Sequence, residues 1–490
     1  WSDHWIYNLD LLENYLAVYP EKRRYILMDK KSFTFFDNTH RVLPRDDKYV
    51  VWDGLPMQLG AVTVDAEKES MIKQRSSDPY EVRTRFGKGE IYRTTLINKM
   101  ICLAANKLAS LDPFGVGIEM ESDKPNWYDA LNGLPGQLGS SICETLELKR
   151  MILFMLDSLD EVVDHKPVSW PLFAECEELI AHLHRLLKEY FSSKDPDRDF
   201  NFWDRACSAK EEYRAKTALG LSGKEETLHL NTLREFLELA LAKIDLGIDK
   251  AWDKKQKILN TYFINRPVAY DLITEAGPGG KKIVKKNRKG LPCFRARKFK
   301  QIALPLFLEG PVHFLKIERD AGTCRDLARR IRASGLYDRK LKMYKVNESL
   351  VDQPMEIGRT RIFSRGWLEN ESIWMHMEYK YLLELLRSGL YAEFYNDFKT
   401  MLIPFLKPET YGRSILENSS FIAISANPDP NIHGTGFVAR LISAAGDPGR
   451  GGIPLVAPTT AGSSGGGGYS FFINVGHISS ATNDSTRTRM

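Results

Sequence analysis

An aromatic and carboxylate cluster in the first third of the chain has the composition of a sugar-binding site. Trp127, Tyr128 and Asp129 precede a run of turn-forming residues, and a helix is expected from Ser141, with Glu144 placed for a capping box. The apolar face of a pyranose stacks on an aromatic ring, and its hydroxyls donate hydrogen bonds to ionised carboxylates. This stretch therefore predicts a carbohydrate site at the start of a helix.

A second cluster with the same chemistry lies about 240 residues further on. It holds Glu369, Glu371 and Trp374 and also precedes a predicted helix. Because both clusters stand at helix starts, we expect those helices to converge on one pocket. Plainer interpretations stay open: Asp129 bracing its loop, Glu369 favoured by the helix dipole, and Trp374 packed in the core.

Composition restricts the class of protein. The chain has 490 residues, of which 43% are hydrophobic, so a large core is expected. Its net charge of +5 provides no strong field to recruit nucleic acid or a membrane. Six scattered cysteines show neither metal-ligand nor redox spacing, so we expect free thiols and a cytoplasmic location. No window of about 18 uncharged apolar residues predicts a membrane span.

Helical periodicity dominates the chain, which predicts a mainly all-α fold. Helices are expected over 4–18, 92–110, 141–161, 171–192, 205–218, 228–262, 319–334, 368–389 and 391–403. Short apolar runs at 49–52 and 303–308 are interpreted as strands or buried loops.

Two regions stand apart in composition. Residues 165–300 form a block of charged helices that ends in a basic run, where ten of the twenty residues 281–300 are Lys or Arg. The run could contact a polyanion, or it could be a solvated loop, which is the interpretation we favour. Residues 442–490 are rich in Gly and Ser, and we expect a poorly ordered, low-complexity tail.

Four segments, taken in order, resemble the catalytic domain of the cellobiose-phosphorylase-like family of inverting glycoside phosphorylases. They are Trp-Ser-Asp-His-Trp (1–5), Pro-Asn-Trp-Tyr-Asp-Ala-Leu-Asn-Gly-Leu (125–134), Gly-Trp-Leu-Glu-Asn-Glu (366–371), and the stretch from Tyr-Gly-Arg-Ser to His-Gly-Thr-Gly-Phe-Val-Ala-Arg (411–440). The resemblance implies an (α/α)6 toroid with long loops at one rim. Its first part would be 1–164 and its last part 301–441, with 165–300 as a helical insertion and 442–490 as a tail.

The resemblance assigns roles to a few positions. Sugar binding falls to Asp3, Trp127, Asp129 and Glu369, and Glu371 joins them through its cluster. Phosphate binding falls to His433 and Arg440. The family's general acid belongs to an Arg-Asp segment upstream of residue 1, so the catalytic residue is unknown and the chain is expected to be a truncated catalytic domain.

The function implied is phosphorolysis of β-linked glucosides or oligoglucans to a sugar 1-phosphate. Inorganic phosphate would be the co-substrate, with no metal or other cofactor, and the partners would be an oligosaccharide or glucan rather than nucleic acid or a membrane. A homodimer is left open. Two alternatives remain: an inverting glucan hydrolase with Asp129, Glu369 or Glu371 as base, and an inactive carbohydrate-binding remnant. A function of a different class also stays open: a helical scaffold protein that binds a polyanion through the basic run.

Overall fold

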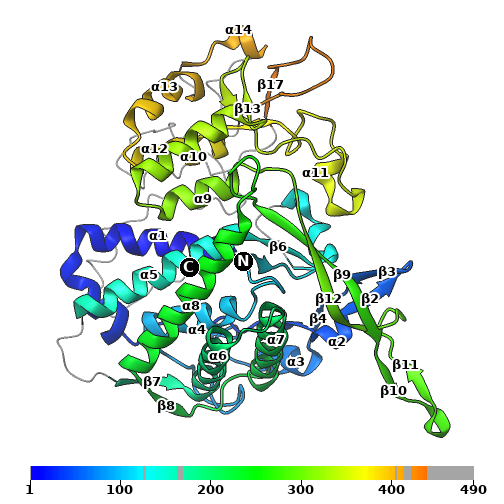
Figure 1. Ribbon diagram of the computed structural model, residues 1–490. Coiled ribbons are helices and arrows are strands. Elements are labelled where there is room, and N and C mark those ends of the chain that lie inside the picture. The colour runs from blue at the N-terminus through cyan, green and yellow to red at the C-terminus, as the bar shows by residue number, and fades with distance from the viewer. Residues whose placement is uncertain (1, 125–128, 163–168, 403–404, 413–420, 439–490) are drawn as a thin grey trace. The chain divides into compact units, whose positions relative to one another are not determined.

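The chain is a mixed α/β protein, and its computed structural model describes residues 2–124, 129–162, 169–402, 405–412 and 421–438. About 48% of the structure is helical and 19% is strand, in several small antiparallel sheets (Figure 1). The predicted all-α (α/α)6 toroid, with long loops at one rim and a helical insertion, is therefore wrong. Helices form where the apolar periodicity predicts them, but many segments between them pair as strands.

The chain divides into two compact units. The first comprises Trp1–Ile6, Glu21–Ile317 and Leu350–Ile362, and the second comprises Tyr7–Pro20, Glu318–Ser349 and Phe363–Met490. The first boundary between the two units, after Ile6, falls within helix α1 (Ser2–Val18). The domain boundaries predicted after residues 164, 300 and 441 stay predictions, and the predicted tail 442–490 lies outside the described residues.

Most of the α-helices in the described part of the chain lie in the first unit. They are α2 (Arg45–Lys48), α3 (Ala66–Lys73), α4 (Leu96–Leu108), α5 (Ile142–Val162), α6 (Ala174–Ser192), α7 (Arg198–Lys216), α8 (Leu230–Ala251), α9 (Glu309–Ile317) and α11 (Arg359–Ile362). Helix α4 shows why the prediction works, because Thr95 caps its first turn and its apolar stripe is buried. Helix α8 stops short of the predicted end at residue 262. There the Asp253 side chain accepts the amides of Lys255 and Gln256 in a local turn that competes with the helix.

The main sheet of the first unit has four antiparallel strands in the order β12–β9–β6–β5. Their bounds are β5 (Ile118–Glu119), β6 (Gly139–Ser141), β9 (Tyr262–Leu272) and β12 (Phe294–Ala303). Strands β9 and β12 form a long hairpin that β10 (Thr274–Ala276) and β11 (Lys282–Val284) extend to its tip (Figure 1). The basic run 281–300 therefore lies within this hairpin, in β11, β12 and the segment that joins them.

Three small antiparallel pairs complete the strands of this unit. They are β1 (His40–Val42) with β4 (Val62–Val64), β2 (Tyr49–Trp52) with β3 (Leu55–Gln58), and β7 (Ser169–Phe173) with β8 (Glu225–His229). The apolar run 49–52 is thus a strand. Its first residue, Tyr49, packs in a core cluster with Trp203 and Phe294.

The second unit combines helices with short strands. Its elements after α1 are α10 (Ala321–Ala333), β13 (Tyr337–Asp338), β14 (Met343–Tyr344), β15 (Ile373–Trp374), α12 (Met375–Arg387), α13 (Tyr391–Met401), α14 (Pro408–Tyr411), β16 (Phe421–Ala423) and β17 (Gly436–Val438). The helix predicted from residue 368 begins at Met375, because Leu368 and Glu371 have positive φ and β15 pairs with β16 just before it. Buried Trp374 donates its indole N–H to the Leu368 carbonyl.

Two further features concern the whole described chain. All six cysteines are free and buried. Among the residues that the structure describes, no helix has the length and apolar character needed to cross a membrane.

Candidate functional site

The residues predicted to bind sugar and phosphate are spread over the two units. Asp3 lies in α1 and Asp129 begins a short 3-10 helix, both in the first unit, while Glu369, Glu371 and His433 belong to the second. Trp127 and Arg440 lie outside the described residues. The convergence of these side chains on one cavity stays a prediction.

Glu371 is held by two cations. Its carboxylate lies 2.5 Å from Arg365 Nε and 3.1 Å from Lys345 Nζ, and its side chain is almost fully buried. Burial alone would raise the pKa of Glu371, but the contacts with Arg365 and Lys345 lower it below its ordinary value. Glu371 is therefore ionised and neutralised, which suits bracing of the loop around Asn347 better than proton transfer.

His433 is also engaged within its unit. Its Nε2 lies 2.9 Å from Asp338 Oδ2, and Ser425 donates a hydrogen bond to the same oxygen. The imidazole thus faces a carboxylate in this arrangement. An anion at His433 would have to compete with Asp338.

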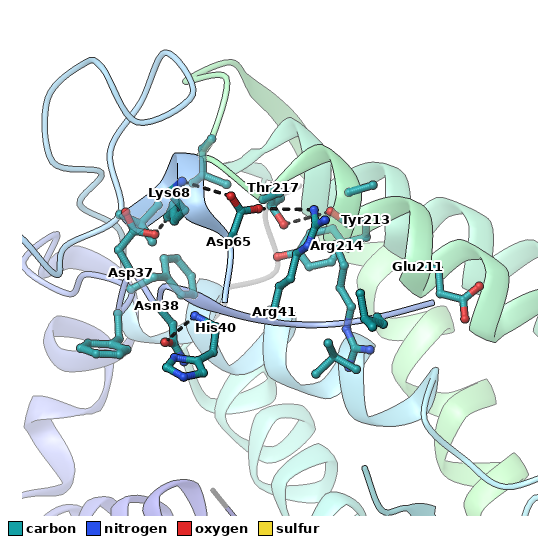
Figure 2. Close-up of a pocket in the computed structure, with 18 of the residues that line it drawn as sticks. Asp37, Asn38, His40, Arg41, Asp65, Lys68, Glu211, Tyr213, Arg214 and Thr217 are labelled. Carbon is teal, nitrogen blue, oxygen red and sulfur yellow. Dashed lines mark hydrogen bonds and ion pairs between the residues drawn. The ribbon is translucent and has the colours of Figure 1, made fainter. Parts of the chain in front are cut away.

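A pocket of about 610 Å³ opens in the first unit (Figure 2). One wall is the segment 35–44, which includes β1, and the opposite wall is the end of α7 with residues 217–221. Asp65 and Lys68 close one side. Asp65 also caps α3, because its side chain accepts the Lys68 amide. The pocket walls thus combine helices and strands with the loop segments that join them.

Aromatic rings and hydrogen-bonding groups share this pocket. Phe35, Phe36 and Phe173 provide rings, and the Phe36 side chain is 71% exposed while it stacks on Tyr80. Asn38 and the exposed His40 and Arg41 provide polar groups.

Several polar groups of the pocket are already oriented. Arg41 Nη1 lies 3.3 Å from Asp65 Oδ2, and the His40 amide donates to Asn38 Oδ1. The exposed Phe36 ring, beside the oriented Asn38 amide and the Arg41 guanidinium, suits a polyhydroxylated ligand.

The scaffold under the pocket is a buried charge network. Asp37 accepts from Lys68 Nζ at 2.5 Å and from Arg75 Nη1 at 2.8 Å, and the three side chains are nearly inaccessible. Buried charges persist only when they are paired in this way. The network fixes the turn that places Phe36 and Asn38.

Helix α7 presents a second set of groups to two carboxylates, the half-buried Glu119 and the buried Glu121. The side chains are spaced by four, three and four residues and so share one helical face: Trp203, Cys207, Lys210 and Arg214. Trp203 Nε1 donates to Glu119 Oε1 at 2.6 Å, and Arg214 Nη1 lies 3.2 Å from Glu121 Oε1. Lys48, which precedes β2, donates to the other oxygen of Glu121.

The environments of the two carboxyls push their pKa values apart. Burial raises the pKa of Glu119 to about 7, against the opposing charges of Lys210 and Lys48. Burial acts on Glu121 as well, but Lys48 and Arg214 outweigh it and hold its pKa well below the ordinary range. Near neutral pH Glu119 can therefore carry a proton, whereas Glu121 is ionised. Such divergence between neighbouring carboxyls is typical of acid–base sites.

Sequence reasoning missed Glu119 and Glu121, although they lie just before the cluster at 127–129. A signal was present: Ile118 and Met120 are buried, and Glu119 and Glu121 alternate with them on the other face of an extended segment. The partners on α7 and before β2 could not be assigned to them from the sequence.

One group of side chains in the described part of the chain could hold a metal ion. Cys143, Glu309 and His313 bring their ligand atoms within 4.8 Å of one another, and all three are buried. The Glu-x-x-x-His spacing on α9 was the available signal, but Cys143 lies far away in sequence.

Comparison with known proteins adds no relative from which a role could be transferred. No model of a known protein family matches this chain, and no curated protein sequence matches it. The chemistry of its own side chains must carry the functional conclusion.

Proposed function

We propose that this chain is a carbohydrate-active protein that binds an oligosaccharide in the pocket between β1 and α7. The observation that supports this proposal most is the combination of exposed Phe36 with oriented Asn38, His40 and Arg41 in a pocket of about 610 Å³. A sugar ring would stack on Phe36, and its hydroxyls would exchange hydrogen bonds with the polar groups.

The chemical step that fits the neighbouring carboxyls is acid-assisted cleavage of a glycosidic bond. The proton donor must be protonated near neutral pH, and Glu119 meets this condition because burial raises its pKa to about 7. Glu119 would take the role that the family resemblance gives to an upstream aspartate. Arg214, which lines the pocket and contacts Glu121, connects the carboxyl pair to the pocket wall.

The state of Glu121 favours phosphorolysis over hydrolysis. Hydrolysis by inversion requires a carboxylate base to activate water. Glu121 is a poor base, since Lys48 and Arg214 neutralise it and lower its pKa. Phosphorolysis needs no base, because phosphate is itself the nucleophile and is held by cations such as Arg41. We therefore propose phosphorolysis of a β-linked glucoside to a sugar 1-phosphate.

Calorimetric titration with β-linked gluco-oligosaccharides tests the binding part. Phe36→Ala should weaken binding by up to about tenfold, because stacking on a ring contributes roughly 0.5–1.5 kcal/mol. Tyr395→Ala is the matched control, as Tyr395 is 68% exposed and lies in the second unit. Equal affinity of the two variants for the oligosaccharide, or no binding by the wild type, would refute the pocket assignment.

A phosphate-dependent assay tests the chemical part. Wild-type protein with oligosaccharide and phosphate should release a sugar 1-phosphate, and Glu119→Gln should abolish release while binding persists. Release of free sugar without phosphate would identify a hydrolase. Binding with no turnover under either condition would leave a carbohydrate-binding protein and remove Glu119 as proton donor.

A further inference from the structure

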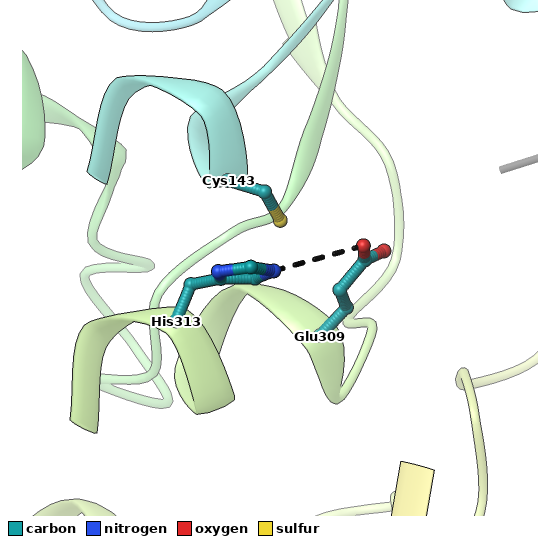
Figure 3. A group of neighbouring side chains, drawn as sticks. All are labelled: Cys143, Glu309 and His313. Carbon is teal, nitrogen blue, oxygen red and sulfur yellow. Dashed lines mark ion pairs between the residues drawn. The ribbon is translucent and has the colours of Figure 1, made fainter. Parts of the chain in front are cut away.

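Helices α5 and α9 bring three buried side chains together at a place that the proposed sugar pocket does not include (Figure 3). Cys143 comes from α5, and Glu309 and His313 lie one turn apart on α9. Their Sγ, carboxylate oxygen and imidazole nitrogen all lie within 4.8 Å of one another, with His313 Nε2 at 3.9 Å from Glu309 Oε1. The proposed sugar site uses none of the three.

We propose that Cys143, Glu309 and His313 bind a divalent transition-metal ion, for which Zn²⁺ is the best match. Thiolate, imidazole and carboxylate are the ligands that Zn²⁺ takes in proteins, and this mixture is too soft for Mg²⁺ or Ca²⁺. Thiolate and carboxylate together carry two negative charges, which a divalent ion balances inside the protein. This inference does not rest on the proposed function.

The imidazole is oriented as a metal ligand requires. His313 Nδ1 lies 2.8 Å from Glu147 Oε1, and Glu147 also pairs with Lys316 and Arg150. An ionised carboxylate can only accept a hydrogen bond. Nδ1 of His313 therefore carries a proton and donates the hydrogen bond to Glu147. With the proton on Nδ1, Nε2 is the nitrogen that can bind a metal ion, and it faces Glu309. A carboxylate that fixes the tautomer in this way is a regular companion of a metal-bound histidine.

The carboxylate is oriented as well. The buried Tyr262 hydroxyl donates to Glu309 Oε2, while Oε1 is the oxygen nearest to His313. Tyr262 begins β9, so a strand of the main sheet sets the direction of this ligand. Both Glu309 and His313 thus have a second partner that aims them at Cys143.

The backbone that carries the ligands is fixed by Thr261. Its carbonyl accepts the Ile142 amide at the start of α5, and its hydroxyl accepts the Gly310 amide at the start of α9. The hydroxyl donates in turn to the Phe307 carbonyl. One residue therefore ties both helix starts together, and the three ligands are largely in place before an ion arrives.

The separation between His313 and Glu309 agrees with a small contraction around an ion. Ligand bonds of about 2.0–2.3 Å in a tetrahedron place neighbouring ligand atoms roughly 3.4 Å apart. The 3.9 Å between His313 Nε2 and Glu309 Oε1 must shorten by about half an ångström, which side-chain rotation allows. Three protein ligands leave a fourth position for water.

Cobalt titration of the metal-free folded chain is the experiment. Co²⁺ should bind at one ion per chain and give a thiolate-to-cobalt charge-transfer band, which Zn²⁺ then removes because it binds more tightly at a tetrahedral site with thiolate. Cys143→Ser should lose the band. The matched control is Cys324→Ser, which changes another buried free cysteine, in the second unit, and should keep it. Far-ultraviolet circular dichroism checks that each variant is folded.

Glu147→Gln separates a metal site from a merely structural cluster. It leaves the three ligands in place but weakens the partner of Nδ1, so Co²⁺ affinity should fall about 10- to 100-fold. If Cys143→Ser does not fold, His313→Gln takes its place in the titration. Absence of the band in the wild type, its persistence in Cys143→Ser or His313→Gln, or unchanged affinity in Glu147→Gln would overturn the proposal.

Discussion

Arg214 joins the pocket between β1 and α7 to the carboxylate of Glu121, because it lines the pocket while its Nη1 lies 3.2 Å from Glu121 Oε1. The guanidinium is a little over one quarter exposed and the carboxylate is buried. A ligand that pairs with Arg214 therefore weakens the positive charge that stabilises the ionised carboxylate of Glu121. Occupation of the pocket and protonation of the carboxyls are expected to influence each other.

Replacing Arg214 tests this connection through stability. Arg214→Leu should lower the free energy of unfolding by about 2 kcal/mol, since a hydrogen bond to a buried charged group contributes roughly 1.5–3 kcal/mol. Arg214→Lys retains the charge and should lose less. Urea denaturation measures both, and equal stability of Arg214→Leu and the wild type would contradict the pairing.

Glu119 should make stability depend on pH. Its pKa rises from an ordinary 4.5 to about 7 on folding, so the folded state holds a proton that the unfolded state has released. Stability is full below pH 4.5 and falls as pH rises through 7, by about 3 kcal/mol at 1.36 kcal/mol per pKa unit. Glu119→Gln cannot ionise and should lack this loss. Denaturation curves between pH 4.5 and 8 give the comparison, and parallel curves would exclude the raised pKa.

Trp203 should control the pKa of Glu119. Its indole N–H favours the ionised carboxylate, so Trp203→Phe should raise the pKa of Glu119 further above 7. Carbon-13 NMR of labelled glutamate carboxyls follows the titration directly. Phe202→Leu, which changes the preceding aromatic residue of α7 and leaves the indole in place, is the control. A lower pKa in Trp203→Phe would reverse the assigned direction.

Gly247 allows α8 to approach a neighbouring loop. A Cβ at this position would lie 2.0 Å from the Gly115 carbonyl oxygen, and backbone cannot move aside as a flexible side chain does. Gly247→Ala should therefore destabilise the protein by about 1–3 kcal/mol or more, despite the better helix propensity of alanine. Gly322→Ala near the start of α10 meets only the Asp320 side chain and should change stability by less than about 1 kcal/mol. Thermal unfolding of both variants provides the test.

The sequence predicted helices better than strands for a physical reason. Helix α4 is defined by its own stripe and by Thr95, which are local features. Strand β6 owes its existence to β9, where Ser140 pairs with Phe263 across more than 120 residues. No local pattern encodes such a partner, so a sheet was not expected and the fold class was wrong.

The candidate site was predictable only in part for the same reason. A carboxyl can be recognised in a sequence, but its pKa cannot, because burial and the charges of Lys48, Lys210 and Arg214 determine it. Sequence reasoning therefore favoured residues beside aromatic neighbours and passed over Glu119. The roles assigned to Asp129 and Glu369 stay predictions.

The long hairpin of β9 and β12 has a consequence for proteolysis. Its base is buried and paired with β6, whereas its outer half and the β10–β11 tip are mostly exposed and rich in Lys and Arg. Trypsin should cut first within 281–289, where six of the nine residues are Lys or Arg, at positions 281, 282, 285, 286, 288 and 289. The two fragments would remain associated through the inner ladder, as a nicked protein that separates only on denaturation.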